Sequence, residues 1–146
     1  MKAIKVLPKQ CVGCEICGIV CSVTHGDQTR ESAMRIRIKH RYPDLPTPPF
    51  QPLVCRNCDK PRCADACPRQ ALILDQEIGQ VRLVESKCDG CGQCVEACPF
   101  HAIWLDPLKK VAIKCDLCNG DPQCIAYCNS NAIQSPFERN RFEVAK

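Results

Sequence analysis

The sequence has few of the large apolar residues from which an enzyme core is built. Leu, Ile, Val and Phe account for 34 of the 146 residues, about 23%, and aromatic residues for only 5%. The hydrophobic fraction of 45% falls to about 34% when the cysteines are left out. A chain of this kind buries a thin core and usually needs disulfide or metal cross-links. The composition therefore excludes a large single-core enzyme and a coiled coil.

Targeting segments and catalytic motifs are also missing from the sequence. No run approaches 18 apolar residues, so we expect no membrane span. The first residues, MKAIKVLPKQC, are too short and too soon interrupted to be a secretory signal. The sequence contains no Ser-His-Asp set, phosphate-binding loop or dinucleotide fingerprint, and its acidic residues show no paired arrangement. We therefore expect a cytoplasmic protein without catalytic residues of its own.

Cysteine is what the sequence has in excess, with 16 residues or about 11%. In a reducing compartment such cysteines bind metal more often than they form disulfides, although an even number leaves disulfides formally open. The cysteines form four groups with none left over. The groups are the first, C-x2-C-x2-C-x3-C at Cys11, Cys14, Cys17 and Cys21; the second, C-x2-C-x4-C-x3-C at Cys55, Cys58, Cys63 and Cys67; the third, C-x2-C-x2-C-x3-C-P at Cys88, Cys91, Cys94 and Cys98; and the fourth, C-x2-C-x5-C-x3-C at Cys115, Cys118, Cys124 and Cys128.

This spacing predicts iron–sulfur clusters. The third group is the full bacterial-ferredoxin run, in which one tight loop supplies three thiolates to a [4Fe–4S] cluster. The fourth cysteine follows one helical turn after the third and serves the neighbouring cluster in two-cluster ferredoxins. Structural zinc is the alternative, but zinc modules usually separate two C-x2-C pairs by a dozen or more residues. Here a third cysteine follows each pair within six residues.

An internal repeat accompanies three of the groups. Four residues after the last cysteine stands Ala and then an aliphatic residue, at 71–72, 102–103 and 132–133. Each pair opens a strand-like run, and the first two runs are followed by a turn and a second alternating run, which predicts two β-hairpins between cluster-binding loops. We expect short helices near residues 61–67, 92–98 and 123–128.

The first group departs from the repeat. Basic and apolar residues alternate over 34–42, as in a strand. The basic face (Arg35, Arg37, Lys39 and Arg41) is expected to be solvated, and the alternative role for it is docking of an acidic partner or tuning of cluster potential. Residues 43–52 are rich in proline and are expected to form an extended surface strap. Residues 137–146 are expected to be a polar tail with Phe137 and Phe142 as anchors.

The four-group pattern resembles the four-cluster ferredoxin-like subunits that carry electrons for molybdenum- and tungsten-pterin oxidoreductases, including formate dehydrogenases and dimethyl-sulfoxide-type reductases. Small size makes the short cytoplasmic subunits of tungsten aldehyde oxidoreductases the most similar members. The resemblance implies four [4Fe–4S] clusters, with the groups paired first with fourth and second with third. The implied ligand sets are Cys11, Cys14, Cys17 and Cys128 (site 1); Cys115, Cys118, Cys124 and Cys21 (site 2); Cys55, Cys58, Cys63 and Cys98 (site 3); and Cys88, Cys91, Cys94 and Cys67 (site 4).

The expected fold is therefore α+β, with two intertwined bacterial-ferredoxin-like modules built of short helices and β-hairpins. One compact unit of residues 1–146 would contain module A (1–42 and 108–146), module B (53–107) and the connector 43–52. The chain lacks the long insertions of larger members, and Asn129 replaces the proline that follows the last cysteine elsewhere, so the end of that helix is expected to differ.

The charge of the chain is offset by its predicted clusters. The formal charge is +4. An oxidised cluster with its four thiolates adds two negative charges, so four clusters bring the total to about −4, and the basic residues do not indicate nucleic-acid binding. Lys87 and Lys114, which precede the first cysteines of two groups, are expected on the surface, and offsetting the charge of a cluster is the alternative role for each. Trp104 is expected to be a core or interface anchor, and no ligand role is expected for His25, His40 and His101.

These expectations combine into one function, a relay of single electrons through four clusters. Its partners would be a large catalytic pterin-type subunit and a second redox protein such as a flavoprotein, ferredoxin or hydrogenase subunit, and a chain with exits at both ends would also stack with copies of itself. A relay needs at least two docking surfaces. The alternatives are a relay for a hydrogenase, formate dehydrogenase or carbon monoxide dehydrogenase, a freely diffusing polyferredoxin and a structural zinc-binding module.

Overall fold

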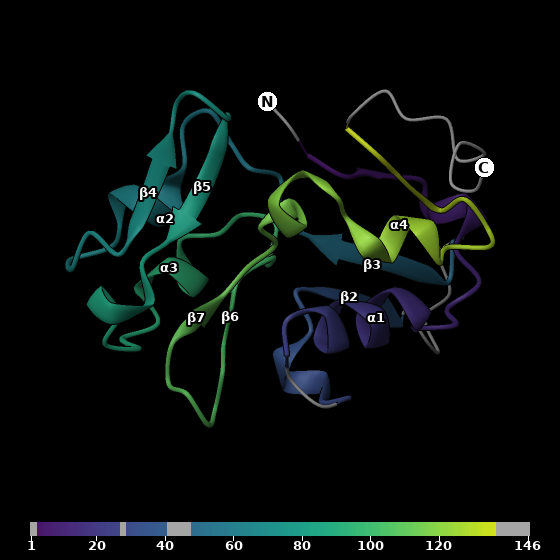
Figure 1. The fold of residues 1–146 in the computed structure, drawn as a ribbon, viewed down its shortest axis with the longest axis horizontal. Coiled ribbons are helices and arrows are strands. Elements are labelled where there is room, and N and C mark those ends of the chain that lie inside the picture. The colour runs from purple at the N-terminus through teal and green to yellow at the C-terminus, as the bar shows by residue number, and fades with distance from the viewer. Residues whose placement is uncertain (1–2, 27–28, 41–47, 137–146) are drawn as a thin grey trace.

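We describe residues 3–26, 29–40 and 48–136 in a computed structural model of the chain. The predicted tail, with Phe137 and Phe142, and residues 43–47 of the predicted connector lie outside the described residues. Helices and strands are short throughout (Figure 1). Loops carry most of the cysteines.

Three four-residue helices begin one residue before the third cysteine of a group. They are α2 (Arg62–Asp65), α3 (Gln93–Glu96) and α4 (Gln123–Ala126), which confirms the three predicted positions. The end of α4, which Asn129 follows in place of the usual proline after the last cysteine, differs as expected. The N–H groups of Ala66 and Ala97 at the ends of α2 and α3 donate to the carbonyl of the first helix residue at 2.9 and 3.0 Å, whereas Tyr127 at the end of α4 bonds to the Ile125 carbonyl.

The first group forms a longer helix, α1 (Ile16–Thr24), whose length the sequence analysis did not predict. Ser22 and not proline follows Cys21, which is compatible with the continuation of the helix for three more residues. Helix α1 packs against α4, whereas α2 packs against α3. The helix contacts therefore join the first group to the fourth and the second to the third.

A repeated turn explains the Ala-aliphatic repeat. Three residues after the last cysteine the backbone turns left-handed, with φ of 49°, 48° and 55° at Gln70, His101 and Asn131. The N–H of each turn residue bonds back to the carbonyl of the cysteine at 3.1–3.2 Å. The next N–H, of Ala71 or Ala102, then donates to the sulfur of Cys67 or Cys98 at 3.3 or 3.4 Å. These alanines are fully buried, so a small side chain is required there.

Both predicted hairpins are present. Strand β4 (Leu72–Asp75) pairs antiparallel with β5 (Gln80–Leu83), and β6 (Trp104–Leu105) pairs with β7 (Ala112–Ile113). The aliphatic residue of the repeat is the first residue of β4 and directly precedes β6, and both Leu72 and Ile103 are buried. The hairpins therefore hold one cysteine group against the next.

The two ends of the described chain pair with each other. Strand β1 (Lys5–Val6) lies antiparallel to β8 (Ile133–Gln134), with Val6 opposite Ile133. In Figure 1 these segments run side by side above α4. Strand β8 follows the repeat Ala132-Ile133 as predicted, whereas two residues at positions 5–6 gave no recognisable pattern for β1. This pairing brings the first cysteine group beside the fourth.

A fourth antiparallel pair joins β2 (Ile36–His40) to β3 (Phe50–Val54). Strand β2 lies within the predicted strand 34–42. Strand β3 was not predicted, and its first three residues belong to the expected surface strap, which is therefore wrong for 50–52. Pro52 is tolerated because this sheet has two strands and the proline lacks only a donor on its outer edge.

The predicted solvated basic face of β2 is only partly exposed. Arg35 pairs with Asp116 at 2.5 Å, and the Arg37 guanidinium lies 4.5 Å from the ring centre of Trp104. Residues from the fourth group and from β6 cover this side of the strand, which the local sequence pattern did not reveal. Lys39 remains exposed.

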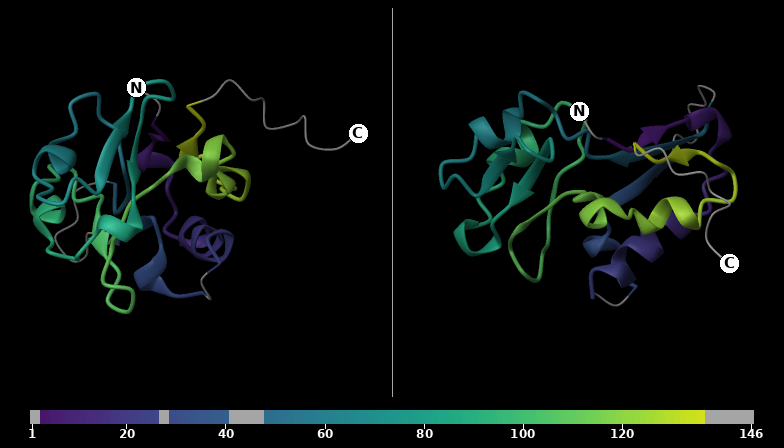
Figure 2. Two further views of the ribbon diagram at one scale, coloured as in Figure 1. Left: turned by 60° about the vertical axis from the view of Figure 1, so that its left-hand side comes forward. Right: turned by 45° about the horizontal axis from the view of Figure 1, so that its top comes forward.

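Four 3-10 helices are present among the described residues: η1 (Pro8–Gln10), η2 (Glu31–Ala33), η3 (Glu85–Lys87) and η4 (Leu117–Gly120). Buried residues gather in two clusters. One contains Ile4, Ile36, Val54 and Ile133 with cysteines of the first, second and fourth groups; the other contains Leu72, Val81, Ile103 and cysteines of the second and third groups. Figures 1 and 2 show the corresponding two lobes, with α1 and α4 in one and α2 and α3 in the other. No helix among the described residues is long and apolar enough to cross a membrane.

Candidate functional site

The structure describes all sixteen cysteines and gathers thiols from different groups into sets. Two sets line cavities of their own. One cavity is lined by Cys67, Cys88, Cys91 and Cys94, and another by Cys21, Cys115, Cys118 and Cys124. The members of each set come from two groups that are far apart in the sequence.

The other two sets are seen in the influence of thiols on one another. Burial, together with the charges of Cys128, Cys11 and Cys14, raises the pKa of Cys17 to about 12. Burial, together with Cys55 and Cys98, likewise raises the pKa of Cys63 to about 12. Burial and the same two thiols also raise the pKa of Cys58. In each case a thiol has a neighbour from a distant group, Cys128 for Cys17 and Cys98 for Cys58 and Cys63.

The surroundings of the thiols fit an iron–sulfur cluster. Several sulfurs accept hydrogen bonds from backbone N–H groups, as such clusters require: Asn57 to Cys55, Ala112 to Cys88 and Leu117 to Cys115, each at 3.4 Å. Burial raises the pKa of Cys94 to about 11 and that of Cys115 to about 12, so these thiols become thiolates only with a positive partner such as iron.

Exposure differs among the four sites. Of the sixteen cysteines, all of which the structure describes, Cys14 in site 1 and Cys91 in site 4 are exposed. Sites 2 and 3 have no exposed cysteine. Cys55 of site 3 and Cys17 of site 1 each contribute a charge effect on a thiol of site 2, namely on Cys115 and Cys124. Cys17, Cys55, Cys115 and Cys124 also share one cluster of buried residues, so thiols of sites 1 and 3 both lie near thiols of site 2.

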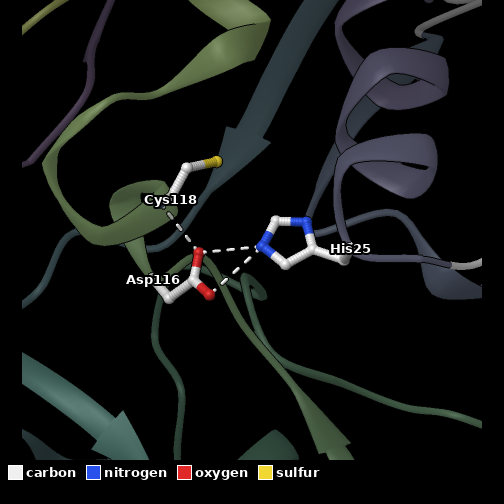
Figure 3. A group of neighbouring side chains, drawn as sticks. All are labelled: His25, Asp116 and Cys118. Carbon is white, nitrogen blue, oxygen red and sulfur yellow. Dashed lines mark hydrogen bonds and ion pairs between the residues drawn. The ribbon is translucent and has the colours of Figure 1, made fainter.

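A histidine that the sequence analysis did not assign a role stands beside site 2. His25 Nε2 lies 3.1 Å from both carboxylate oxygens of Asp116, and Nδ1 lies 2.7 Å from the Cys21 carbonyl oxygen (Figure 3). Asp116 and Cys21 raise the pKa of His25 to about 10. Although burial raises the pKa of Asp116, His25 and Arg35 lower it to about 2.

This charged group ties the first cysteine group to the fourth. His25 caps α1, and Asp116 accepts the backbone N–H of Cys118 at 3.0 Å and so shapes the loop that carries two ligands of site 2. Donor atoms of His25, Asp116 and Cys118 lie within 4.8 Å of one another, as in a metal site. Since Cys118 belongs to the thiol set of site 2 and Asp116 is paired with Arg35, the group is part of site 2.

Lys114 is buried, contrary to the surface position expected of it. Its Nζ donates to Asn57 Oδ1 at 3.2 Å, to the Cys115 carbonyl at 2.7 Å and to the Val81 carbonyl. These three oxygens come from three separate segments, so the sequence before Cys115 gave no sign of them. Lys87, its counterpart before Cys88, is exposed as predicted.

The remaining predicted residues lie away from the thiols. His40 pairs with Glu15 at 2.7 Å on the surface, and His101 occupies one of the repeated turns. Trp104 is half-buried beneath Arg37, so it anchors β2 against β6.

Comparisons with known proteins identify the relatives of this chain. Residues 47–136 match the family model described as a 4Fe-4S dicluster domain. The polyferredoxin-like subunit of aliphatic sulfonate oxidoreductase from Pyrococcus furiosus is 36% identical, over 86% of this chain and 70% of that protein. The thiosulfate reductase electron transfer subunit of Salmonella typhi is 32% identical with the same coverage.

Two further similar proteins are also parts of oxidoreductases. A tetrathionate reductase subunit of Archaeoglobus fulgidus is 36% identical over 75% of this chain and 51% of its own length. The solved active-site complex of benzoyl coenzyme A reductase contains a chain with the same fold, with a TM-score of 0.53, 22% identity and coverage of 92% of this chain and 78% of that one. The protein therefore belongs to the 4Fe-4S dicluster domain family of ferredoxin-like iron–sulfur proteins, as the spacing of its cysteines predicted.

Proposed function

We propose that this protein is a non-catalytic electron-transfer subunit that relays single electrons through four [4Fe–4S] clusters. The observation that carries the proposal is the gathering of thiols from different groups around two cavities, Cys67 with Cys88, Cys91 and Cys94, and Cys21 with Cys115, Cys118 and Cys124. A bound cluster supplies one-electron chemistry. The protein residues hold each cluster by four thiolates and donate backbone hydrogen bonds to the sulfurs. They also exclude water from sites 2 and 3, the two inner sites, which have no exposed cysteine.

The proposed ligands are the nested sets of sites 1–4. The packing of α1 against α4 and of α2 against α3 supports this assignment, because the fourth cysteine of each group lies at the end of its helix. The pairing of β1 with β8 supports it for sites 1 and 2. The two lobes would then be two dicluster modules, with sites 1 and 2 in module A and sites 3 and 4 in module B.

Electrons would enter and leave at sites 1 and 4, the two outer sites. Cys14 and Cys91 are exposed, and exposed apolar side chains stand beside the outer ligands. Val12 is 63% exposed between Cys11 and Cys14, Tyr127 is 55% exposed next to Cys128, and Leu105 lines the cavity of site 4. Such side chains suit docking surfaces, so one partner would cover site 1 and another site 4.

The catalytic partner would be a pterin-type oxidoreductase that contains tungsten or molybdenum, and an aldehyde oxidoreductase is the specific expectation. The relatives named for sulfonate oxidoreductase, thiosulfate reductase and tetrathionate reductase support an oxidoreductase complex. The second partner would be a flavoprotein, a ferredoxin or a hydrogenase subunit.

Iron and sulfide analysis of anaerobically purified protein tests the cluster content. We expect about 16 iron and 16 sulfide per chain and an electron paramagnetic resonance signal on reduction with dithionite. Zinc without acid-labile sulfide would overturn the proposal.

Native purification under nitrogen tests the role as a subunit. We expect the chain to co-migrate with a large pterin-containing protein on gel filtration and to be reduced when the substrate of that protein is added. Migration as a free small protein, with full cluster content, would instead identify a diffusing polyferredoxin.

A further inference from the structure

We propose that Lys114 is a fixed positive charge shared by the two inner clusters, at sites 2 and 3, and that it raises their reduction potentials. The inference rests on the proposed cluster content and adds a residue that sets the energy of the relay. It concerns a side chain that is not a cluster ligand and that the sequence placed on the surface.

Burial and three hydrogen bonds fix the position of the Lys114 side chain. The residue follows β7 and directly precedes Cys115 of site 2, and it is 3% exposed. Its three N–H donors match three acceptors, Asn57 Oδ1 and the carbonyl oxygens of Val81 and Cys115. The ammonium group is therefore held in one place between the cysteine loops of the second and fourth groups.

All three acceptors are neutral. A buried charge in a protein is normally paired with an opposite charge, because desolvation otherwise costs several kcal/mol. Among the described residues no carboxylate bonds to Lys114 Nζ. The negative charges that remain nearby are those of the two inner sites, since Cys115 is a neighbour in sequence and Asn57 stands between Cys55 and Cys58.

Both inner sites respond to this lysine. Burial raises the pKa of Cys63 in site 3 and of Cys115 in site 2, and the Lys114 charge opposes that rise at both thiols. Asn57 links the lysine to site 3 directly, because its backbone N–H donates to the Cys55 sulfur while its side-chain oxygen accepts from Nζ. Asn57 is itself fully buried.

A cation in this position favours the reduced form of both clusters. Reduction adds one negative charge to a cluster, and the attraction of a nearby positive charge is strong where water is excluded. The inner clusters would then hold electrons more tightly than the outer clusters, so the relay would store charge at its centre until a partner docks at either end.

The test is a potentiometric titration of the anaerobic holoprotein, followed by electron paramagnetic resonance, for wild type and Lys114→Met. Methionine has a similar length and no charge. We expect two of the four reduction waves of Lys114→Met to move to lower potential by about 59 mV or more. For a one-electron couple this is a tenfold change in the redox equilibrium constant. Lys114→Arg keeps the charge and should leave the waves near their wild-type potentials.

Lys87→Met is the matched control, because Lys87 precedes Cys88 as Lys114 precedes Cys115 but is exposed. It should shift no wave by a comparable amount, since solvent screens its charge. Full iron content with four unshifted waves in Lys114→Met would overturn the inference while leaving the cluster content intact. A wild-type protein without clusters would instead overturn the proposed function.

If Lys114→Met binds less iron than the wild type, the iron content of two further variants provides a second measurement. Lys114→Gln keeps a hydrogen-bond donor without charge. Failure of the Met and Gln variants to load iron, together with normal loading of Lys114→Arg, supports the shared counter-charge. Failure of all three variants overturns it, because the site would then require the shape of lysine and not its charge.

Discussion

Single residues determine whether each cysteine loop can close. The residue just before the second cysteine of every group has a left-handed backbone, with φ of 71°, 44°, 73° and 57° at Gly13, Asn57, Gly90 and Leu117. Two groups use glycine, for which this conformation is free of strain. In the first and third groups the neighbours also leave no room for a side chain.

Gly90→Ala should weaken site 4. An added Cβ would clash with the backbone carbonyl oxygen of Lys110, in addition to the strain of positive φ. We expect a loss of about 3 kcal/mol from these two effects. It would be measured as faster loss of visible cluster absorption in urea under nitrogen.

Gly79→Ala is the control for backbone strain alone. Its φ is 64°, but its Cβ would meet nothing within 4 Å. We expect it to cost about 1 kcal/mol and to leave the iron content unchanged. Equal effects of the two substitutions would contradict the close approach of Lys110.

Cys98→Ala tests the nested pairing at a single thiol. The variant should lose the cluster of site 3, held with Cys55, Cys58 and Cys63, although its sequence neighbours Cys88, Cys91 and Cys94 remain intact. We expect about four fewer iron atoms per chain, or a three-iron signal from the damaged site.

Double variants identify the site that is lost. Adding Cys58→Ala to Cys98→Ala should remove little further iron, because both thiols serve one cluster. Adding Cys91→Ala should remove a second cluster. The opposite pattern would mean that each group binds its own cluster.

At the scale of elements, the two hairpins have similar sequence patterns but different surroundings. Asp75 and Asp106 occupy the same position in the runs ALILD and AIWLD, and each accepts backbone N–H groups of its turn. Asp106 is buried and also binds Arg30 through two hydrogen bonds of 3.0 Å, which lower its pKa to about 2. This pair connects the β6–β7 hairpin to the segment that follows α1.

Asp106→Asn should therefore loosen the contact between these two elements. The amide keeps an acceptor for the turn but loses the charge that holds Arg30, and we expect a cost of about 2 kcal/mol. The measurement is the urea concentration at which the circular dichroism of the holoprotein is half lost, under nitrogen.

Asp75→Asn is the matched control, since its pair with Arg82 is 3.5 Å long and Arg82 is 66% exposed. An exposed pair contributes little, so the midpoint should stay close to that of wild type. Comparable shifts in the two variants would show that the turn, and not Arg30, is what Asp106 stabilises.

At the scale of the whole molecule, the apolar core is divided and shallow. Its two clusters of buried residues include cysteines, whose side chains face the cluster sites. The paired strands have two to five residues, and each sheet among the described residues has two strands. Such sheets are marginal on their own, so the stability of the fold depends on what binds at the thiols.

Removal of iron should therefore unfold the protein. We expect a chelator added under nitrogen to abolish the far-ultraviolet circular dichroism and the cooperative unfolding transition, because cluster binding and folding are coupled as for structural zinc sites. Reconstitution with iron and sulfide should restore both signals. Cooperative unfolding of the iron-free chain would contradict this dependence.

Local patterns predicted the parts of this fold that repeat. The positions of α2, α3 and α4 and both hairpins follow from cysteine spacing and from the Ala-aliphatic pairs. The pairing of β1 with β8 and the strand β3 were not predicted, since two residues carry no period and a proline-rich stretch does not resemble a strand. The ion pair of His25 and the burial of Lys114 were not predicted, because their partners, Asp116 and Asn57, are 91 and 57 residues away.

The sequence alone determined the chemistry, because four cysteines at short intervals suit a cluster whatever surrounds them. Only the tertiary structure decided the environment of those thiols. It brought the first group to the fourth and the second to the third, exposed Cys14 and Cys91, and buried a lysine between two sites. Ligand identity depends on spacing along the chain, whereas exposure and charge depend on segments that meet only when the chain is folded.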